Sequence, residues 1–171
     1  MTRAEQHRSL FVAAEAFLAF AGAGIAGTIW RFDQLHQDLP CTSDNGCGIV
    51  AASPYSHIDL IFVHNVPVAL LGLLGYLLLL SLAMLRLGSD NLRLDRTLHG
   101  LIGLVSGGGF GYSWYLQWIA YDKIHATCIW CRVSAVIMTL LFSTAVWEWR
   151  AGRLPSQRRQ ETLSEHSPAK R

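Results

Sequence analysis

The sequence predicts an all-α membrane protein: a four-transmembrane-helix bundle with one large extracytoplasmic loop between the first and second helices. Of the 171 residues, 51% are hydrophobic and only 15% are charged. The apolar residues run together for about twenty positions at a time, whereas a soluble domain would interrupt them with polar residues. The net charge of +2 is too small, and the arginines too scattered, to indicate a nucleic-acid partner, so the expected surroundings are the lipid bilayer.

Four apolar windows are each long enough to cross a hydrocarbon core of roughly 30 Å at about 1.5 Å per residue. They are residues 10–30, 66–85, 98–121 and 126–147. Each must be a helix, because lipid offers no partners for the polar groups of irregular backbone. The first window is too long for a signal peptide and lacks a clear cleavage site, so we expect it to be retained. The spacing of Gly103, Gly107 and Gly111 in the third window predicts close helix packing within the bundle.

Basic residues predict the orientation of the windows. Eleven of the 14 Lys and Arg residues lie before the first window, between the second and third, or after the fourth. Basic residues near span ends are retained in the cytoplasm, so both termini are expected there, and residues 31–65 are expected to face the outside or a lumen. In a bacterial inner membrane that side is the periplasm. This divides the chain into four parts. They are a cytoplasmic N-terminus (1–9), a transmembrane domain (10–149), its extracytoplasmic loop (31–65) and a disordered cytoplasmic tail (150–171).

All four cysteines lie on the predicted outer side, where disulfides form and persist. Cys41 and Cys47 belong to C-T-S-D-N-G-C in the loop, a polar stretch that predicts a flexible turn. Cys128 and Cys131 belong to C-I-W-C, at the start of the fourth window. A C-x-x-C at a helix start favours a reactive thiolate, because the positive end of the helix dipole lies beside it. The two pairs therefore indicate disulfide exchange.

The four cysteines allow three other interpretations. Covalent haem attachment requires C-x-x-C-H, and Arg132 occupies the histidine position. A zinc site usually joins two short-spaced cysteine knuckles, which these spacings do not match, so no metal site is expected. Two permanent disulfides in a non-enzymatic membrane scaffold remain the serious alternative, since most secreted-side cysteines are structural. The readily exchanged C-x-x-C spacing favours redox chemistry over that alternative.

With these motifs in this order, the chain resembles the vitamin K epoxide reductase family of membrane thiol-quinone oxidoreductases. The resemblance extends over residues 10–149, and the loop pair precedes the C-x-x-C, the reverse of the order in the functionally similar DsbB-type oxidases. No thioredoxin-like domain follows the fourth window, as in bacterial-type members without the fusion. The matching features are the Cys41 and Cys47 pair, Ser53, the S-P-Y-S stretch, the N-V-P-V-A-L-L-G-L-L-G-Y run and the Y-D…C-I-W-C segment.

The resemblance implies a catalytic relay through all four cysteines. A separate thioredoxin-fold DsbA-like protein would reduce the loop pair by attacking Cys41, and Cys47 would then attack Cys128. Cys131 would face a membrane quinone of the ubiquinone, menaquinone or vitamin K type, which receives the electrons. Such an enzyme would support disulfide bond formation. The alternative within the family is that reduction of the quinone or of vitamin K epoxide is itself the main activity.

The resemblance also points to residues that would bind the quinone. Ser53 matches the family's serine. Asn65 or His64 could donate a hydrogen bond to the quinone near the mouth of the bundle, although an interfacial capping role before Pro67 is favoured. Val68 and Ala135 stand where the animal enzymes have an asparagine and a tyrosine. The loss of both polar groups favours a plain quinone over an epoxide as the acceptor.

Glu15 and His125 are two further candidate functional residues. Glu15 is a carboxylate inside the first window, which marks it as a candidate functional residue, but a helix contact or snorkelling to the interface is the favoured interpretation. His125 precedes the C-I-W-C motif and could assist proton movement, although an interfacial histidine without a catalytic role is favoured.

Overall fold

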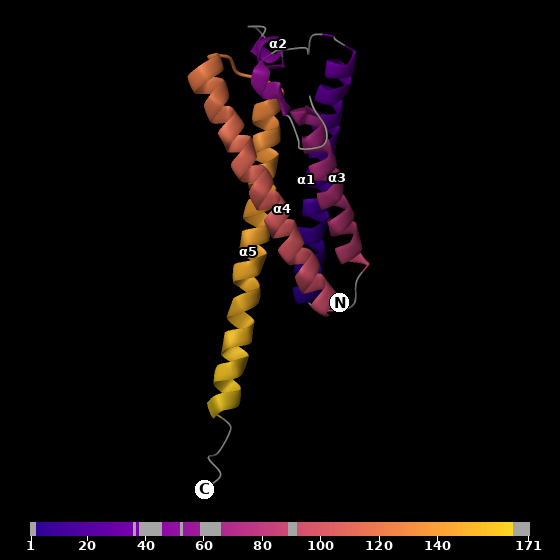
Figure 1. The fold of residues 1–171 in the computed structure, drawn as a ribbon. Coiled ribbons are helices and arrows are strands. Elements are labelled where there is room, and N and C mark those ends of the chain that lie inside the picture. Colours follow the sequence, from indigo (N-terminus) through magenta and orange to yellow (C-terminus); the bar gives the residue numbers. More distant parts are fainter. Residues whose placement is uncertain are drawn as a thin grey trace.

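The computed structural model describes residues 3–35, 37, 46–51, 53–58, 66–88 and 92–165. Within these residues, four long helices form an elongated bundle (Figure 1). The long helices are α1 (Arg3–Gln34), α3 (Val68–Leu87), α4 (Leu92–Ile119) and α5 (Ile129–Glu165). The shorter elements are α2 (Gly46–Ala51), the 3₁₀ turn η1 (Pro54–Ser56), the strands β1 (His57–Ile58) and β2 (Val66–Pro67), and the π-helical turn η2 (Ala120–Ile124).

The core of the bundle is built from small residues on α1 and large ones on its neighbours. Ala19, Ala23 and Ala26 are buried on one face of α1 and pack against Tyr76 and other apolar side chains of α3, α4 and α5. A Cβ atom at Gly22 would overlap the Tyr76 ring, so only glycine allows α1 and α3 to approach this closely. The short antiparallel pair β1–β2, with Ile58 opposite Val66, leads the chain from η1 into α3.

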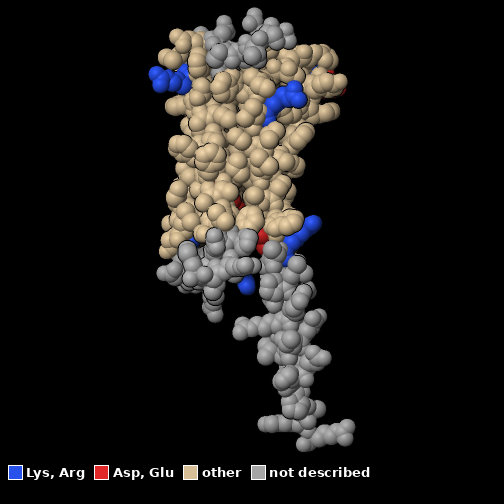
Figure 2. All heavy atoms as spheres, turned by 180° about the vertical axis from the view of Figure 1, so that it is seen from behind, with Lys and Arg blue, Asp and Glu red and all other residues tan. Residues whose placement is uncertain are grey.

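In the part of the chain that the structure describes, three helical segments are long and apolar enough to cross a membrane: Ser9–Gln34, Val68–Leu87 and Ile129–Arg150. Their outward surfaces carry large exposed apolar side chains such as Phe17, Phe20 and Trp147, which water would not favour. In Figure 2 the charged side chains gather at the two ends, and the band between them is almost entirely uncharged. The chain is therefore a membrane protein.

The fourth predicted span is helical but differs in composition from the other three. Residues 98–121 fall within α4 and η2, yet α4 does not reach the apolar character of a candidate span. Its glycines, serines and indole and phenol groups lower the mean hydropathy of a helix that still packs along α5 and α3. Four membrane crossings therefore remain a prediction, whereas the four-helix packing of the described residues is observed.

One boundary differs from the sequence prediction. The expected disordered tail from residue 150 is helical as far as Glu165, because α5 continues without a break through a segment rich in the strong helix formers Arg, Gln, Glu and Leu. Within the described residues of 31–65, the chain forms the last turn of α1, then α2, η1 and β1.

The predicted glycine packing in α4 is correct at one of the three positions. A Cβ at Gly107 would lie 3.1 Å from the Phe142 ring of α5, so this glycine brings the two helices together. Gly103 and Gly111 have nothing within 4 Å of their Cβ positions, so their predicted role in packing is wrong. The neighbouring Gly109 contributes instead, because a Cβ there would lie 2.8 Å from Met138.

Candidate functional site

At one end of the bundle, helix α2 carries Cys47 into a buried cluster with Cys128. Their exposed fractions are 1% and 3%, and Ile29 and Phe32 from the end of α1 pack around them. The close approach depends on Gly46, where a Cβ would lie 2.6 Å from the backbone oxygen of Thr127. Cys47 therefore packs on Cys128, the cysteine that the family resemblance gave as its target.

The local structure around the loop pair differs from the expected flexible turn. Cys47 lies within the first turn of α2, so its end of the C-T-S-D-N-G-C stretch is helical. Cys41 lies outside the described residues. A helix holds the Cys47 side chain in one direction, against Cys128, which a mobile turn would not do.

The cysteines are in two different redox states. Cys47 is disulfide-bonded, whereas Cys128 and Cys131 are free thiols.

The C-I-W-C motif makes its two thiols unequal. Cys128 directly precedes α5, and Cys131 lies in the first turn of that helix. A hydrogen bond from the Cys131 thiol, together with hydrogen bonds from the backbone N–H groups of Cys131 and Trp130, outweighs the effect of burial and lowers the pKa of Cys128 to about 7. Cys128 is therefore partly a thiolate at neutral pH, the form that attacks and leaves in disulfide exchange.

A cavity of about 1020 Å³ opens beside the cysteines, between the four long helices. Cys47, Cys128 and Cys131 all line it, together with many apolar side chains and a few polar groups. This volume and this mixture are typical of a site for a flat, mostly apolar small molecule. Val68 also lines the cavity, and Ala135 is buried, so both positions where the animal enzymes are polar are apolar here.

Two hydroxyl groups of the cavity wall were not identified from the sequence. The Tyr76 hydroxyl donates a hydrogen bond to the backbone oxygen of Ser134 at 2.9 Å and lies 3.0 Å from the Ser134 Oγ. Ser134 follows Cys131 by one helical turn, so both face the same side of α5. The i, i+3 spacing from the second cysteine was the sequence signal for Ser134, whereas nothing local pointed to Tyr76.

The other predicted site residues have different outcomes. Ser53 lines the cavity, and its Oγ donates to the Val50 backbone oxygen at 2.7 Å, which caps the end of α2. Its role as a quinone ligand stays a prediction. Asn65 and His64 lie outside the described residues. His125 is exposed and has a left-handed backbone with φ of 51°, where η2 ends and the chain turns toward Cys128.

Glu15 lies at the opposite end of the bundle from the cysteines. Its Oε2 pairs with Arg86 Nη1 at 3.0 Å, so the predicted helix contact is confirmed, between α1 and α3. Arg86 itself was expected in the connection between the second and third windows. It is instead buried in the last turn of α3, because three carboxylates on other helices surround its guanidinium group.

A search of curated proteins finds no match to this chain. The sequence profile of the vitamin K epoxide reductase family matches residues 12–146, which include both cysteine-bearing segments and every helix that lines the cavity. The match extends over most of the chain and agrees with the site described above. The chain is a membrane oxidoreductase that belongs to the vitamin K epoxide reductase family.

Proposed function

We propose that this protein passes electrons from a separate thioredoxin-fold DsbA-like protein to a membrane quinone and thereby supports disulfide bond formation. The observation that carries the proposal is the packing of Cys47 on Cys128 at the edge of the cavity. Disulfide exchange needs an attacking sulfur in contact with the sulfur it attacks, and these two come from different pairs. The relay has three balanced steps.

In the first step, the loop disulfide oxidises the partner protein. A partner thiolate attacks Cys41, a mixed disulfide forms, and Cys47 leaves as a thiolate. The second partner thiol then attacks the mixed disulfide, which releases Cys41 as a thiol. The partner leaves with a new disulfide, and the loop pair holds its two electrons.

In the second step, the electrons move to the C-I-W-C pair. The Cys47 thiolate attacks Cys128 in the Cys128–Cys131 disulfide, a Cys47–Cys128 bond forms, and Cys131 leaves as a thiolate. Cys41 then attacks Cys47, which restores the loop disulfide and releases Cys128. The lowered pKa of Cys128 favours its departure as a thiolate. A disulfide-bonded Cys47 with free thiols at Cys128 and Cys131 is the redox state that follows this step.

In the third step, Cys128 and Cys131 form their disulfide again and give up two electrons and two protons. A quinone in the cavity supplies the two-electron acceptor and leaves as the quinol. Cys131 lines the cavity, and Ser134 follows it by one helical turn. The Tyr76 hydroxyl holds Ser134 by donating to its backbone oxygen, and the Ser134 hydroxyl can donate a hydrogen bond to a carbonyl oxygen of the quinone. This hydroxyl would take the place of the polar groups absent at Val68 and Ala135.

The proposal is tested by stopped-flow mixing of the purified protein in detergent with a reduced DsbA-like donor and ubiquinone or menaquinone analogues. We expect quinone absorbance to fall with the donor present and to stay constant in the Cys128→Ser variant. A quinone that is reduced by a small thiol but never by the protein donor would instead favour quinone reduction as the main activity. Absence of turnover with every donor and quinone would contradict both.

The proposed orientation places the cysteines on the periplasmic side and both termini in the cytoplasm. The excess of basic residues at the other end of the bundle supports it. In a cysteine-free background, Arg96→Cys and Asp122→Cys place single exposed thiols at opposite ends of α4 and η2. A membrane-impermeant maleimide applied to intact cells should label position 122 and spare position 96, and the reverse pattern would invert the topology.

A further inference from the structure

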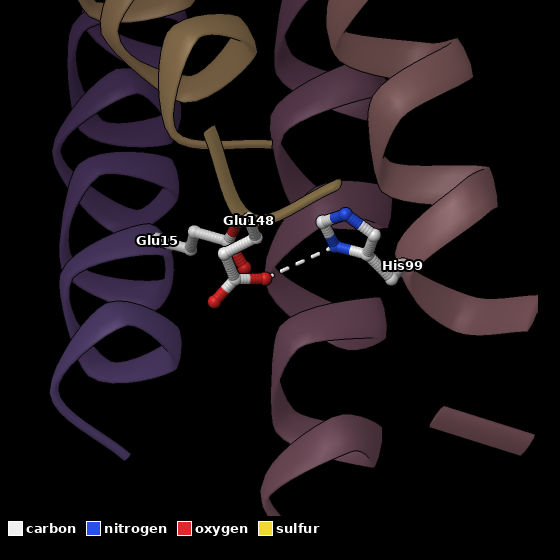
Figure 3. Close-up of side chains that lie close together, drawn as sticks. All are labelled: Glu15, His99 and Glu148. Carbon is white, nitrogen blue, oxygen red and sulfur yellow. Dashed lines mark ion pairs between the residues drawn. The ribbon is translucent and has the colours of Figure 1, made fainter. Parts of the chain in front are cut away.

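Three side chains capable of binding a metal converge at the end of the bundle away from the cysteines. Glu15 comes from α1, His99 from α4 and Glu148 from α5, and one ligand atom of each lies within 4.8 Å of the others. Figure 3 shows the two carboxylates and the imidazole directed toward one another between the helices. Because the three side chains come from three helices, their positions do not depend on the conformation of a single loop.

The strongest indication of a ligand is a buried oxygen of Glu15. Among the described residues, Glu15 Oε1 is a buried side-chain atom without a hydrogen-bond partner. The Glu15 side chain is almost fully buried, with an exposed fraction of 1%. Burying such an atom without a partner is costly, so a cation bound to it would remove a real penalty.

His99 also brings a nitrogen ligand next to an oxygen ligand. Its Nδ1 lies 3.1 Å from Glu148 Oε2. A metal ion bound to both residues would therefore have one imidazole nitrogen and one carboxylate oxygen in its coordination shell.

Arg86 holds the two carboxylates in place without using all their oxygens. Its Nη1 and Nη2 donate to Oε2 of Glu15 and Oε2 of Glu148, each at 3.0 Å, and its Nε donates to Asp95 Oδ1 at 3.1 Å. Hydrogen bonds to the carboxylates of a metal site are the usual way in which proteins orient such ligands. Three carboxylates face one guanidinium in this cluster, and a divalent cation would balance the excess of negative charge.

We propose that Glu15, His99 and Glu148 bind one divalent transition-metal ion, such as Zn²⁺, Mn²⁺ or Fe²⁺. One imidazole and two carboxylates suit these ions, whereas Mg²⁺ and Ca²⁺ prefer oxygen ligands alone. His99 and Glu148 are each partly exposed and provide a path for the ion. Because the ligands come from α1, α4 and α5, the ion joins these three helices at the end of the bundle that lies away from the cysteines.

The test uses the full-length protein without an affinity tag, in detergent, with all cysteines oxidised so that free thiols do not bind the metal. Equilibrium dialysis against Zn²⁺ should give one bound ion, and Zn²⁺ at about 100 times the dissociation constant should raise the Tm by roughly 5 °C. Both effects should be lost in His99→Gln. They should be retained in His125→Gln, which removes an exposed histidine, and in Asp95→Asn, which weakens an Arg86 ion pair outside the trio.

X-ray absorption at the zinc edge of the wild-type protein makes the result independent of whether a variant folds. One nitrogen ligand of imidazole type with oxygen ligands supports the proposal, while a spectrum without imidazole contradicts it. No bound ion, or equal binding by His99→Gln, would also overturn it and leave an ion-pair network only. None of these outcomes depends on quinone reduction, so the test of the metal site is independent of the test of the proposed function.

Discussion

The Cys131 backbone N–H donates a hydrogen bond to the Cys128 sulfur at 3.3 Å. This contact exists because Cys131 lies in the first turn of α5, where backbone N–H groups have no partner within the helix. It stabilises a negative charge on Cys128 and adds to the effect of the neighbouring Cys131 thiol. The turn that joins the loop to α5 therefore favours the thiolate of Cys128, the sulfur that receives electrons from Cys47 in the proposed relay.

The first prediction concerns the pH dependence of Cys128. Its pKa is lowered to about 7, so the reduced protein should gain thiolate ultraviolet absorbance with a midpoint near pH 7, well below the value of about 8.5 for a free cysteine. Because the Cys128 pKa is lower in the folded than in the unfolded protein, ionisation of Cys128 stabilises the folded reduced state at a pH above its unfolded pKa. This contribution to the free energy of unfolding should disappear as the pH falls through about 7. Cys128→Ser serves as the control, and a midpoint near 8.5 in the wild type would refute the assignment.

A second prediction tests the approach of α2 to the C-I-W-C motif. In a variant that retains only Cys47 and Cys128, mild oxidation should join them rapidly, because they are packed together. Adding Gly46→Ala should slow this reaction about tenfold, since its Cβ would meet the Thr127 backbone oxygen at 2.6 Å and push α2 away. Gly108→Ala, with open space at its Cβ, is the matched control. Equal rates in both variants would show that Gly46 does not set the approach.

The third prediction concerns stability at the α1–α3 contact. Gly22→Ala should lower the free energy of unfolding by about 1–3 kcal/mol, because its Cβ would overlap the buried Tyr76 ring. Gly24→Ala on the same helix has nothing within 4 Å and should be neutral or slightly stabilising. Thermal unfolding in detergent compares the two, and a Gly22→Ala protein as stable as Gly24→Ala would contradict this packing.

A fourth prediction addresses the hydroxyl pair in the cavity. Tyr76→Phe removes the hydroxyl that donates to Ser134 and holds it in the cavity wall. The KM for quinone should then rise about fivefold, the effect of losing one hydrogen bond of roughly 1 kcal/mol to the quinone. The exchange of disulfides with the partner protein should keep its rate, because that step uses the cysteines alone. Tyr115→Phe, on an exposed tyrosine, is the control. If both exchange and quinone reduction slow together, Tyr76 acts by holding the helices rather than the quinone.

The fifth prediction concerns the charged end of the bundle. Arg86→Leu should lower the free energy of unfolding by about 3–5 kcal/mol, because it leaves the buried carboxylate of Glu15 without its counter-charge. Arg96→Leu removes an exposed charge and should change it by less than about 1 kcal/mol. Denaturation in detergent, followed by circular dichroism, measures both. A loss of stability no greater than in Arg96→Leu would show that the network contributes little.

Much of the fold follows from local patterns in the sequence. The apolar windows predicted the helices correctly, since backbone groups in lipid must pair within the same segment. The C-I-W-C motif placed two cysteines at the start of a helix for a similarly local reason, the spacing of one helical turn. The glycine spacing in α4 was a weaker guide, because it does not tell which side of the helix faces α5. The contact is at Gly107 and Gly109, not at Gly103 or Gly111.

By itself, the sequence determined the membrane environment, the helical class and the family. These properties depend on composition, short motifs and their order along the chain. Only the tertiary structure decided that Gly46 brings α2 against the Thr127 backbone, that Tyr76 reaches Ser134 and that Glu15 finds its counter-charge on α3. Each of these contacts joins segments far apart in the chain. Their geometry is set by how closely whole helices pack, and no local pattern of residues encodes that distance.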